Sequence, residues 1–119
     1  PRNIDGDVML LAGDITSFKT YKPLKFFLRF WDKPVIYIAG NHEYYSTNME
    51  PAERVAVEWI SQKLPNVHYL KNSAVEIDGV HFFGGTMWTD FDGDLNCMDF
   101  AERSMNDYRQ IRTDKTQRL

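Results

Sequence analysis

Two short polar segments carry the residues of this sequence that are best suited to chemistry. Gly13-Asp14 supplies a carboxylate, and Gly40-Asn41-His42-Glu43 supplies an amide, an imidazole and a second carboxylate. Oxygen and nitrogen donors of this kind suit Mn, Fe, Zn or Mg. An imidazole can also act as an acid or a base near neutral pH. The two segments together therefore predict a metal-binding or acid–base site.

Each polar segment follows an apolar run that predicts a buried strand. These runs are Val8–Ala12 and Val35–Ala39, and a predicted helix lies between them. A strand–helix–strand unit of this length places its two strands in parallel. The carboxyl ends of parallel strands meet at one edge of the sheet, where ligands bind in open α/β folds. The sequence thus predicts that Asp14 and Asn41 share one pocket.

Helical periodicity follows each of the two strands. After Pro23, the spacing of Leu24, Phe27, Leu28 and Trp31 predicts a helix packed on the sheet. A second helix is predicted from about Pro51 to Leu64. Its expected buried face contains Ala52, Val55, Ala56, Trp59, Ile60 and Leu64.

The sequence of the second half of the chain predicts antiparallel strands, which extend the sheet, and a last helix. Short strands are expected at 67–70, 74–77 and 80–83, and Asp78-Gly79 is a strong signal for a tight hairpin turn. We therefore expect an α/β fold in layers, with a central mixed sheet and helices on its faces. A last helix is expected over 96–111, and residues 113–119 are expected to fray. The expected buried face of that helix contains Met98, Ala101, Met105 and Tyr108.

The composition is that of a globular domain. Hydrophobic residues make up 43% and charged residues 26% of 119, the net charge is −3, and no apolar run is long enough to span a membrane. The lone Cys97 predicts a helix-surface residue and a cytoplasmic location. The net negative charge disfavours nucleic acid as a partner. It does not exclude nucleic acid, because the basic residues over 22–33 could form a binding face. The preferred interpretation of these basic residues is a helix face exposed to solvent. We expect residues 1–119 to be one domain, and the absence of an initiator methionine or a closing element suggests part of a longer one.

The segment Gly40-Asn41-His42-Glu43 after a buried strand, with Gly13-Asp14 after the strand before it, resembles the calcineurin-like metallophosphoesterase superfamily. Residues 83–90 and 105–109 also look like stretches of its bacterial members. The resemblance implies that the chain is part of an α/β sandwich that binds two divalent metal ions. It further implies that Asp14 bridges the two metals, that Asn41 is an oxygen ligand of the second, and that His42 is an acid near the leaving group.

Physical chemistry makes these implied roles reasonable. Two cations about 3.5–4 Å apart activate a bridging water and stabilise both oxygens of an in-line displacement. A positioned imidazole can protonate the departing oxygen. The expected function is therefore metal-dependent hydrolysis of a small phosphomonoester or phosphodiester. Arg109 is the candidate for binding the substrate phosphate, and its alternative is a solvated cation at a helix end. For Glu43 the preferred interpretation is pairing with a neighbour or capping of a turn.

The sequence lacks several motifs of the family, so we do not expect these 119 residues to contain all the ligands that a two-metal site needs. The family's first motif, Asp-x-His, and its late motif, Gly-His-x-His, are absent, and His68 and His81 lie within predicted strands rather than at their ends. We therefore expect the remaining ligands outside these residues, and little or no turnover from the 119 residues alone. The Asp-Arg-Gly that follows Gly-Asp in protein phosphatases is also absent. Alternate carboxylates over 90–94 do not match a calcium loop and predict a solvated loop.

A second class of function stays open at this point. The chain could be a binding or scaffold module that keeps the fold without a complete metal site. The loop with Tyr44 and Tyr45 and the basic face over residues 22–33 would then contact a partner.

Overall fold

The computed structural model describes residues 5–113, so the expectation that residues 113–119 fray lies, apart from Thr113, outside it. No helix within this range is long and apolar enough to cross a membrane. The strands are β1 (Met9–Ala12), β2 (Val35–Ile38), β3 (Thr47–Asn48), β4 (Val67–Tyr69), β5 (Ser73–Ile77), β6 (Val80–Gly84) and β7 (Ile111–Arg112). The helices are α1 (Pro23–Leu28), η1 (His42–Tyr44), α2 (Met49–Lys63), η2 (Phe91–Gly93), α3 (Leu95–Ser104) and α4 (Asp107–Gln110).

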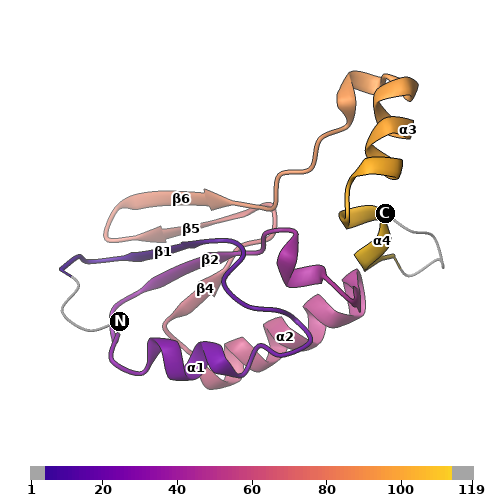
Figure 1. Ribbon diagram of the computed structural model, residues 1–119. Coiled ribbons are helices and arrows are strands. Elements are labelled where there is room, and N and C mark those ends of the chain that lie inside the picture. Colours follow the sequence, from indigo (N-terminus) through magenta and orange to yellow (C-terminus); the bar gives the residue numbers. More distant parts are fainter. Residues whose placement is uncertain (1–4, 114–119) are drawn as a thin grey trace.

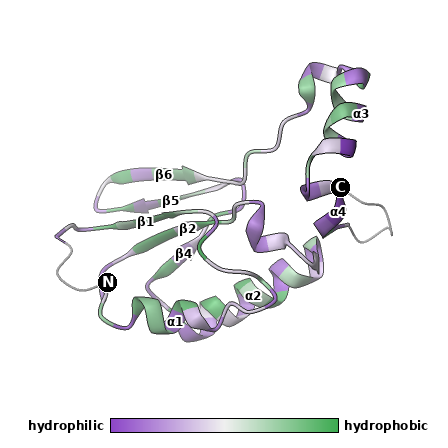
Figure 2. Cartoon of the chain, in the orientation of Figure 1, coloured by the Kyte–Doolittle hydropathy of each residue, from purple (hydrophilic) through white to green (hydrophobic). Residues whose placement is uncertain are grey.

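A parallel sheet with strand order β1-β2-β4 forms the centre of the fold. Met9 pairs with Val35, and Val35 pairs in turn with Val67. The central strand β2 is hydrophobic and mostly buried, as a strand with neighbours on both sides should be (Figure 2). The predicted parallel pairing of the first two strands is confirmed.

Helices α1 and α2 lie on one side of this sheet, as Figure 1 shows. They bury Leu24 and Leu28 from α1, and Ala56 and Ile60 from α2. Two expected core positions were wrong: Phe27 is 44% exposed and Val55 is 50% exposed. The helices are rotated so that the rows Leu24–Leu28 and Glu53–Ala56–Ile60 face inward, which turns Phe27 and Val55 outward.

Strands β5 and β6 form an antiparallel hairpin on the other side of the parallel sheet (Figure 1). Asp78 and Gly79 at its turn have φ of 50° and 78°, as the predicted tight turn requires. The α/β class is confirmed, but within residues 5–113 the hairpin is a separate sheet and does not extend the parallel one. Close packing accounts for the stacking, because Gly84 lies directly against Ile38 and Leu70.

The predicted last helix over 96–111 is broken. Helix α3 ends at Ser104, Met105 is extended with φ −91° and ψ 139°, and α4 begins only at Asp107. Strand β7 then pairs in parallel with β3, where Thr47 is the partner of Ile111. Ala101 and Ile111 are buried, whereas Met105 is 41% exposed. The break turns α4 toward the loop that follows β2.

Candidate active site

The ends of β1 and β2 bring the two polar segments together. Ala12 pairs with Ile38 in the sheet, so Gly13 and Gly40 leave it at neighbouring points. A Cβ at Gly13 would lie 2.7 Å from the Gly40 nitrogen, and a Cβ at Gly40 would lie 2.3 Å from Asp14 Oδ1. Both positions therefore require glycine, and the φ of +89° at Gly13 adds a second reason there.

The Glu43 carboxylate joins these two loops from the inside. Its side chain is fully buried, and its Oε2 accepts hydrogen bonds from the backbone N–H groups of Asp14 at 2.8 Å and Gly40 at 2.7 Å. Its Oε1 accepts from the N–H groups of Ile15 at 2.7 Å and Thr16 at 3.1 Å. One carboxylate thus fixes the backbone on both sides of the candidate pocket. The interpretation of Glu43 as a turn-capping residue is confirmed.

Tyr37 on β2 completes the surroundings of Glu43. Its hydroxyl donates to Glu43 Oε1 at 3.1 Å. Burial, and then the negative charge of Glu43, raise the pKa of Tyr37 far above its ordinary value. The hydroxyl therefore stays a hydrogen-bond donor to Glu43 at any ordinary pH.

Asp14 presents its carboxylate at the surface of the loop. Its backbone is left-handed with φ 56°, a conformation that aspartate tolerates better than most residues. Asp14 Oδ1 accepts a hydrogen bond from the backbone N–H of His42 at 3.0 Å, whereas Oδ2 accepts none from residues 5–113. The carboxylate is held by one oxygen and has the other available for a ligand.

His42 is the first residue of η1, and its side chain is exposed. Its ring lies 4.5 Å from the ring of Tyr45, measured between centroids, at an interplanar angle of 37°. Its backbone N–H donates to Asp14 Oδ1, so the backbone of His42 lies next to the Asp14 carboxylate, while the exposed ring packs against Tyr45.

Asn41 is oriented by a residue from α4. Its Nδ2 donates to Asp107 Oδ1 at 2.8 Å, and the Tyr45 hydroxyl donates to the same oxygen at 2.6 Å. The hydrogen bond to Asp107 is the main cause that raises the pKa of Tyr45 to about 12, so Tyr45 remains a donor. With Nδ2 directed to Asp107, the amide oxygen of Asn41 is the end that can accept from or bind to a ligand.

A cavity of about 440 Å³ lies beside Asn41. Thr86 helps to form its wall, because Thr86 Oγ1 donates to the Ala39 carbonyl at 2.7 Å and ties the segment after β6 to the end of β2. The polar and aromatic residues that line it include Gly40, Asn41, Thr86, Trp88 and Asp107. The cavity therefore lies at the carboxyl ends of β1 and β2, but of the predicted site residues only Asn41 lines it, and Asp14 and His42 do not.

Comparison with known proteins agrees with this geometry. The sequence profile described as calcineurin-like phosphoesterase matches residues 1–116. The chain belongs to this family. The predicted resemblance is confirmed, and so is the α/β class that it implied.

Two curated relatives of this calcineurin-like phosphoesterase chain are considerably longer than it. "Uncharacterized protein L509" of Acanthamoeba polyphaga mimivirus is 30% identical over 112 residues, which span 87% of this chain and 39% of the relative. "UPF0046 protein K07C11.7" of Caenorhabditis elegans is 38% identical over 93 residues, which span 69% of this chain and 32% of the relative. The chain thus spans less than two fifths of either relative. No solved structure matches it significantly.

The donors at this calcineurin-like site suit part of a divalent-metal centre. Asp14 Oδ2 and the Asn41 amide oxygen are hard oxygen donors at one sheet edge, the type that Mn or Mg prefers. Among residues 5–113, no group of three His, Cys, Asp or Glu side chains gathers closely enough to hold a metal. His68 lies within β4 and His81 within β6, where its Nε2 is 3.6 Å from Glu76.

Arg109 lies away from this cavity. Its guanidinium donates to the Arg103 carbonyl near the end of α3 at 2.8 Å. It lines a different cavity of about 460 Å³, with Ser46, Asn48 and Arg112 among the other walls. The structure therefore does not bring Arg109 together with Asp14 and Asn41, and its role in binding phosphate stays a prediction.

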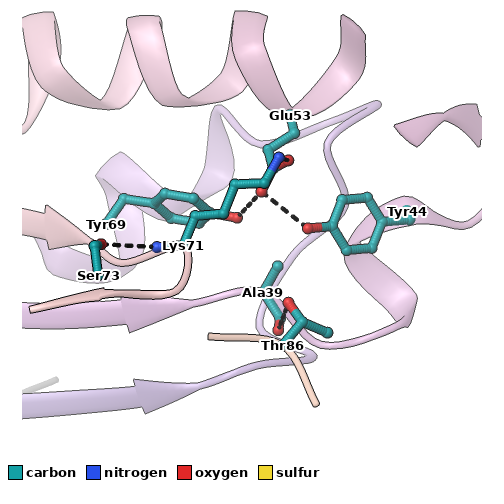
Figure 3. A network of polar contacts seen from close by, with 7 residues as sticks. All are labelled: Ala39, Tyr44, Glu53, Tyr69, Lys71, Ser73 and Thr86. Atoms are coloured by element: carbon teal, nitrogen blue, oxygen red, sulfur yellow. Dashed lines mark hydrogen bonds and ion pairs between the residues drawn. The ribbon is translucent and has the colours of Figure 1, made fainter. Parts of the chain in front are cut away.

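A second buried carboxylate, Glu53 on α2, was not anticipated from the sequence. The hydroxyls of Tyr44 and Tyr69 donate to its Oε1 at 2.9 and 2.5 Å, and the Lys71 ammonium pairs with its Oε2, as Figure 3 shows. Glu53 lies three residues before Ala56 and seven before Ile60, so it faces the same side of α2 as they do. The sequence gives no sign of its partners, because they come from η1, β4 and the segment after β4.

The acidic loop over 90–94 supports the next helix. Asp90 Oδ1 accepts from the N–H of Asp92 at 3.0 Å. Asp94 caps α3 by accepting from the N–H groups of Asn96 and Cys97. These contacts confirm the interpretation of this stretch as a loop that leads into the last helix. Cys97 is exposed on α3, as predicted.

Proposed function

We propose that the protein containing this chain hydrolyses small phosphoesters at a divalent-metal site to which Asp14 and Asn41 contribute oxygen ligands. The observation that carries the proposal is the clamp made by Glu43, which holds both strand-end loops so that Asp14 and Asn41 lie at one edge of the sheet. Membership in the calcineurin-like phosphoesterase family supports phosphoester hydrolysis as the reaction class.

The residues of this chain would have separate tasks. Asp14 and Asn41 present oxygen atoms whose directions are set by His42 N–H and Asp107. When bound, two divalent ions such as Mn, Fe, Zn or Mg would activate a water and neutralise charge on the phosphoryl oxygens. The exposed imidazole of His42 would give a proton to the leaving oxygen, a contribution worth typically about 10²–10⁴-fold.

The test uses the full-length protein, freed of metal and reconstituted with Mn²⁺, with p-nitrophenyl phosphate and bis(p-nitrophenyl) phosphate as substrates. We expect hydrolysis of at least one substrate, and a fall in kcat of about 10²-fold or more for His42→Ala. His81→Ala is the matched control, since His81 is exposed on the distant hairpin. An intact protein that hydrolyses neither ester, or a His42→Ala variant with unchanged kcat, would refute the proposal.

Metal analysis separates this function from a scaffold role. An intact protein that purifies without metal and takes up no Mn²⁺, Fe²⁺, Zn²⁺ or Mg²⁺ would be a binding module that keeps the fold. A nucleic-acid substrate would instead be revealed by an affinity that falls steeply with added salt. We propose a small phosphoester as the substrate, because the basic residues in and around α1 are exposed. In Figure 1, α1 lies on the opposite side of the parallel sheet from the segment after β6, whose residues Thr86 and Trp88 line the cavity.

A further inference from the structure

Asp107 is a buried acid whose contacts are not explained by the stability of its own helix. It is 7% exposed, and its Oδ1 receives two hydrogen bonds, from Asn41 Nδ2 at 2.8 Å and from the Tyr45 hydroxyl at 2.6 Å. Both donors belong to the loop after β2, more than 60 residues earlier in the chain. The carboxylate therefore serves the candidate site rather than α4.

The chemistry of the two side chains fixes the orientation of Asn41. An amide has a donor end and an acceptor end, whereas an ionised carboxylate only accepts. Turning the Asn41 amide over would replace a charge-assisted hydrogen bond by two oxygens facing each other. Asp107 thus selects the one amide orientation in which Asn41 Oδ1 faces away from α4.

The chain reaches this contact through the break between α3 and α4. The extended backbone of Met105 ends α3, and the Asn106 carbonyl then accepts from the N–H groups of Arg109 and Gln110 to start a new turn. Figure 1 shows that α3 runs from the far end of the molecule toward α4, and the extended backbone at Met105 changes the direction of the chain just before Asp107. The position of Asp107 beside Asn41 is therefore a specific consequence of this fold.

We propose that Asp107 is a positioning residue for the metal site: by holding Asn41 Nδ2, it presents Asn41 Oδ1 to a divalent cation. This inference rests on the proposed function, since it assigns a purpose to the Asn41 oxygen. It predicts that Asp107 affects metal binding only through Asn41. Hydrogen-bond partners of metal ligands typically change metal affinity by about 10–100-fold when they are removed.

The experiment measures Mn²⁺ affinity by calorimetry on the metal-free full-length protein. We expect Asp107→Ala to weaken Mn²⁺ binding by about 10-fold or more. Asp107→Asn keeps an oxygen that can accept from Asn41, so it should retain affinity within about 3-fold of wild type. Tyr45→Phe is the matched control, because it removes the other hydrogen bond to Asp107 and leaves that of Asn41 in place. Its Mn²⁺ affinity should stay within about 2-fold of wild type.

A double-mutant cycle distinguishes positioning from general loss of structure. Asn41→Ala and the double variant Asn41→Ala/Asp107→Ala should bind Mn²⁺ equally, because Asp107 has nothing left to orient. Asp107→Ser, whose hydroxyl is too short to reach Asn41, replaces the alanine variant in the cycle if that variant does not fold.

Each outcome has a distinct meaning. If Asp107→Ala binds Mn²⁺ like wild type, or if it weakens binding equally in the Asn41→Ala background, the inference is overturned while the proposed function stands. If the wild-type protein binds none of Mn²⁺, Fe²⁺, Zn²⁺ and Mg²⁺, the proposed function fails, and this inference fails with it. Weak binding by Asp107→Ala, with recovery in Asp107→Asn and no further effect in the cycle, establishes the positioning role.

Discussion

At the scale of single residues, the candidate site is organised by acceptors that hold backbone groups. Glu43 accepts four backbone hydrogen bonds, and Asp14 accepts one from His42. Two loops can be held rigid when their N–H groups converge on one buried carboxylate. The stability of the fold and the geometry of the site therefore depend on the same residue.

Replacement of Glu43 by Gln should show this dependence. One carboxylate oxygen becomes an NH₂ group, so either Asp14 and Gly40 or Ile15 and Thr16 lose their acceptor and face a donor. Each unsatisfied buried N–H costs about 1–3 kcal/mol, and we expect a loss of about 2–4 kcal/mol in the free energy of unfolding. Urea denaturation followed by circular dichroism measures it.

The matched control for this prediction is Glu58→Gln on α2. Glu58 is exposed, and its Oε1 accepts a long hydrogen bond of 3.4 Å from Gln62 Nε2. This change should therefore lower the free energy of unfolding by less than about 0.5 kcal/mol. Equal stabilities of the two variants would show that the Glu43 carboxylate is not needed to hold the loops.

At the scale of elements, the site could be predicted from the sequence to the extent that its signals are local. Apolar runs ending at Gly13 and Gly40 identified both strands, and Asp78-Gly79 identified the hairpin turn. The last helix could not be predicted, because its apolar spacing is helical through residue 108. Contacts of Asp107 with Asn41 and of Ile111 with Thr47 outweigh that local preference and break the helix.

The burial of Glu53 and Asp107 cannot be predicted from the sequence either, because it also depends on contacts between distant parts of the chain. Glu53 shares a helix face with Ala56 and Ile60, but a glutamate is buried only with partners, and these come from η1 and β4. Sequence periodicity reports apolar faces and carries no information about partners that lie far along the chain. The same limit applies to Asp107, which the sequence marks only as part of the family-like stretch over 105–109.

The Glu53 network joins α2 to η1 and β4, and it should make the fold sensitive to alkaline pH. Burial raises the pKa of Tyr44 from 10.0 to about 12, and burial together with Glu53 raises that of Tyr69 further. Both hydroxyls are protonated in the folded state, whereas the unfolded chain releases these protons above about pH 10. Stability is therefore complete below pH 10 and falls as pH rises from 10 toward 12, by up to about 1.4 kcal/mol per pH unit for each tyrosine.

Tyr44→Phe tests this expectation in urea titrations between pH 7 and 12. The variant should be less stable at pH 7 by about 1–2 kcal/mol, because Glu53 loses a hydrogen bond. Its stability should also fall less steeply than wild type above pH 10. Tyr21→Phe, outside the network, shows the effect of removing another tyrosine hydroxyl. A Tyr44→Phe curve that runs parallel to wild type would contradict the prediction.

At the scale of the whole molecule, the described residues leave several large apolar side chains exposed. Leu10 on β1 is 62% exposed, Phe83 on β6 is 76% exposed, and Leu95 and Phe100 on α3 are 78% and 72% exposed. Apolar surface of this kind commonly marks an interaction surface or a risk of aggregation. Measurements on the isolated 119 residues therefore need light scattering to establish that the chain is monomeric.

The isolated 119 residues provide the last test of the donor count. In the proposed site Asp14 and Asn41 would supply two oxygen ligands, fewer than two divalent ions need from a protein. We therefore expect the chain alone to hydrolyse p-nitrophenyl phosphate with Mn²⁺ at least about 10³-fold more slowly than the full-length protein. Circular dichroism should show that the chain is folded during the assay. Asp14→Asn in the same chain identifies background, because contaminating phosphatase activity would persist in it unchanged. Rapid hydrolysis by the wild-type chain that Asp14→Asn abolishes would mean that further ligands lie within these 119 residues and that the metal site is complete without the rest of the protein.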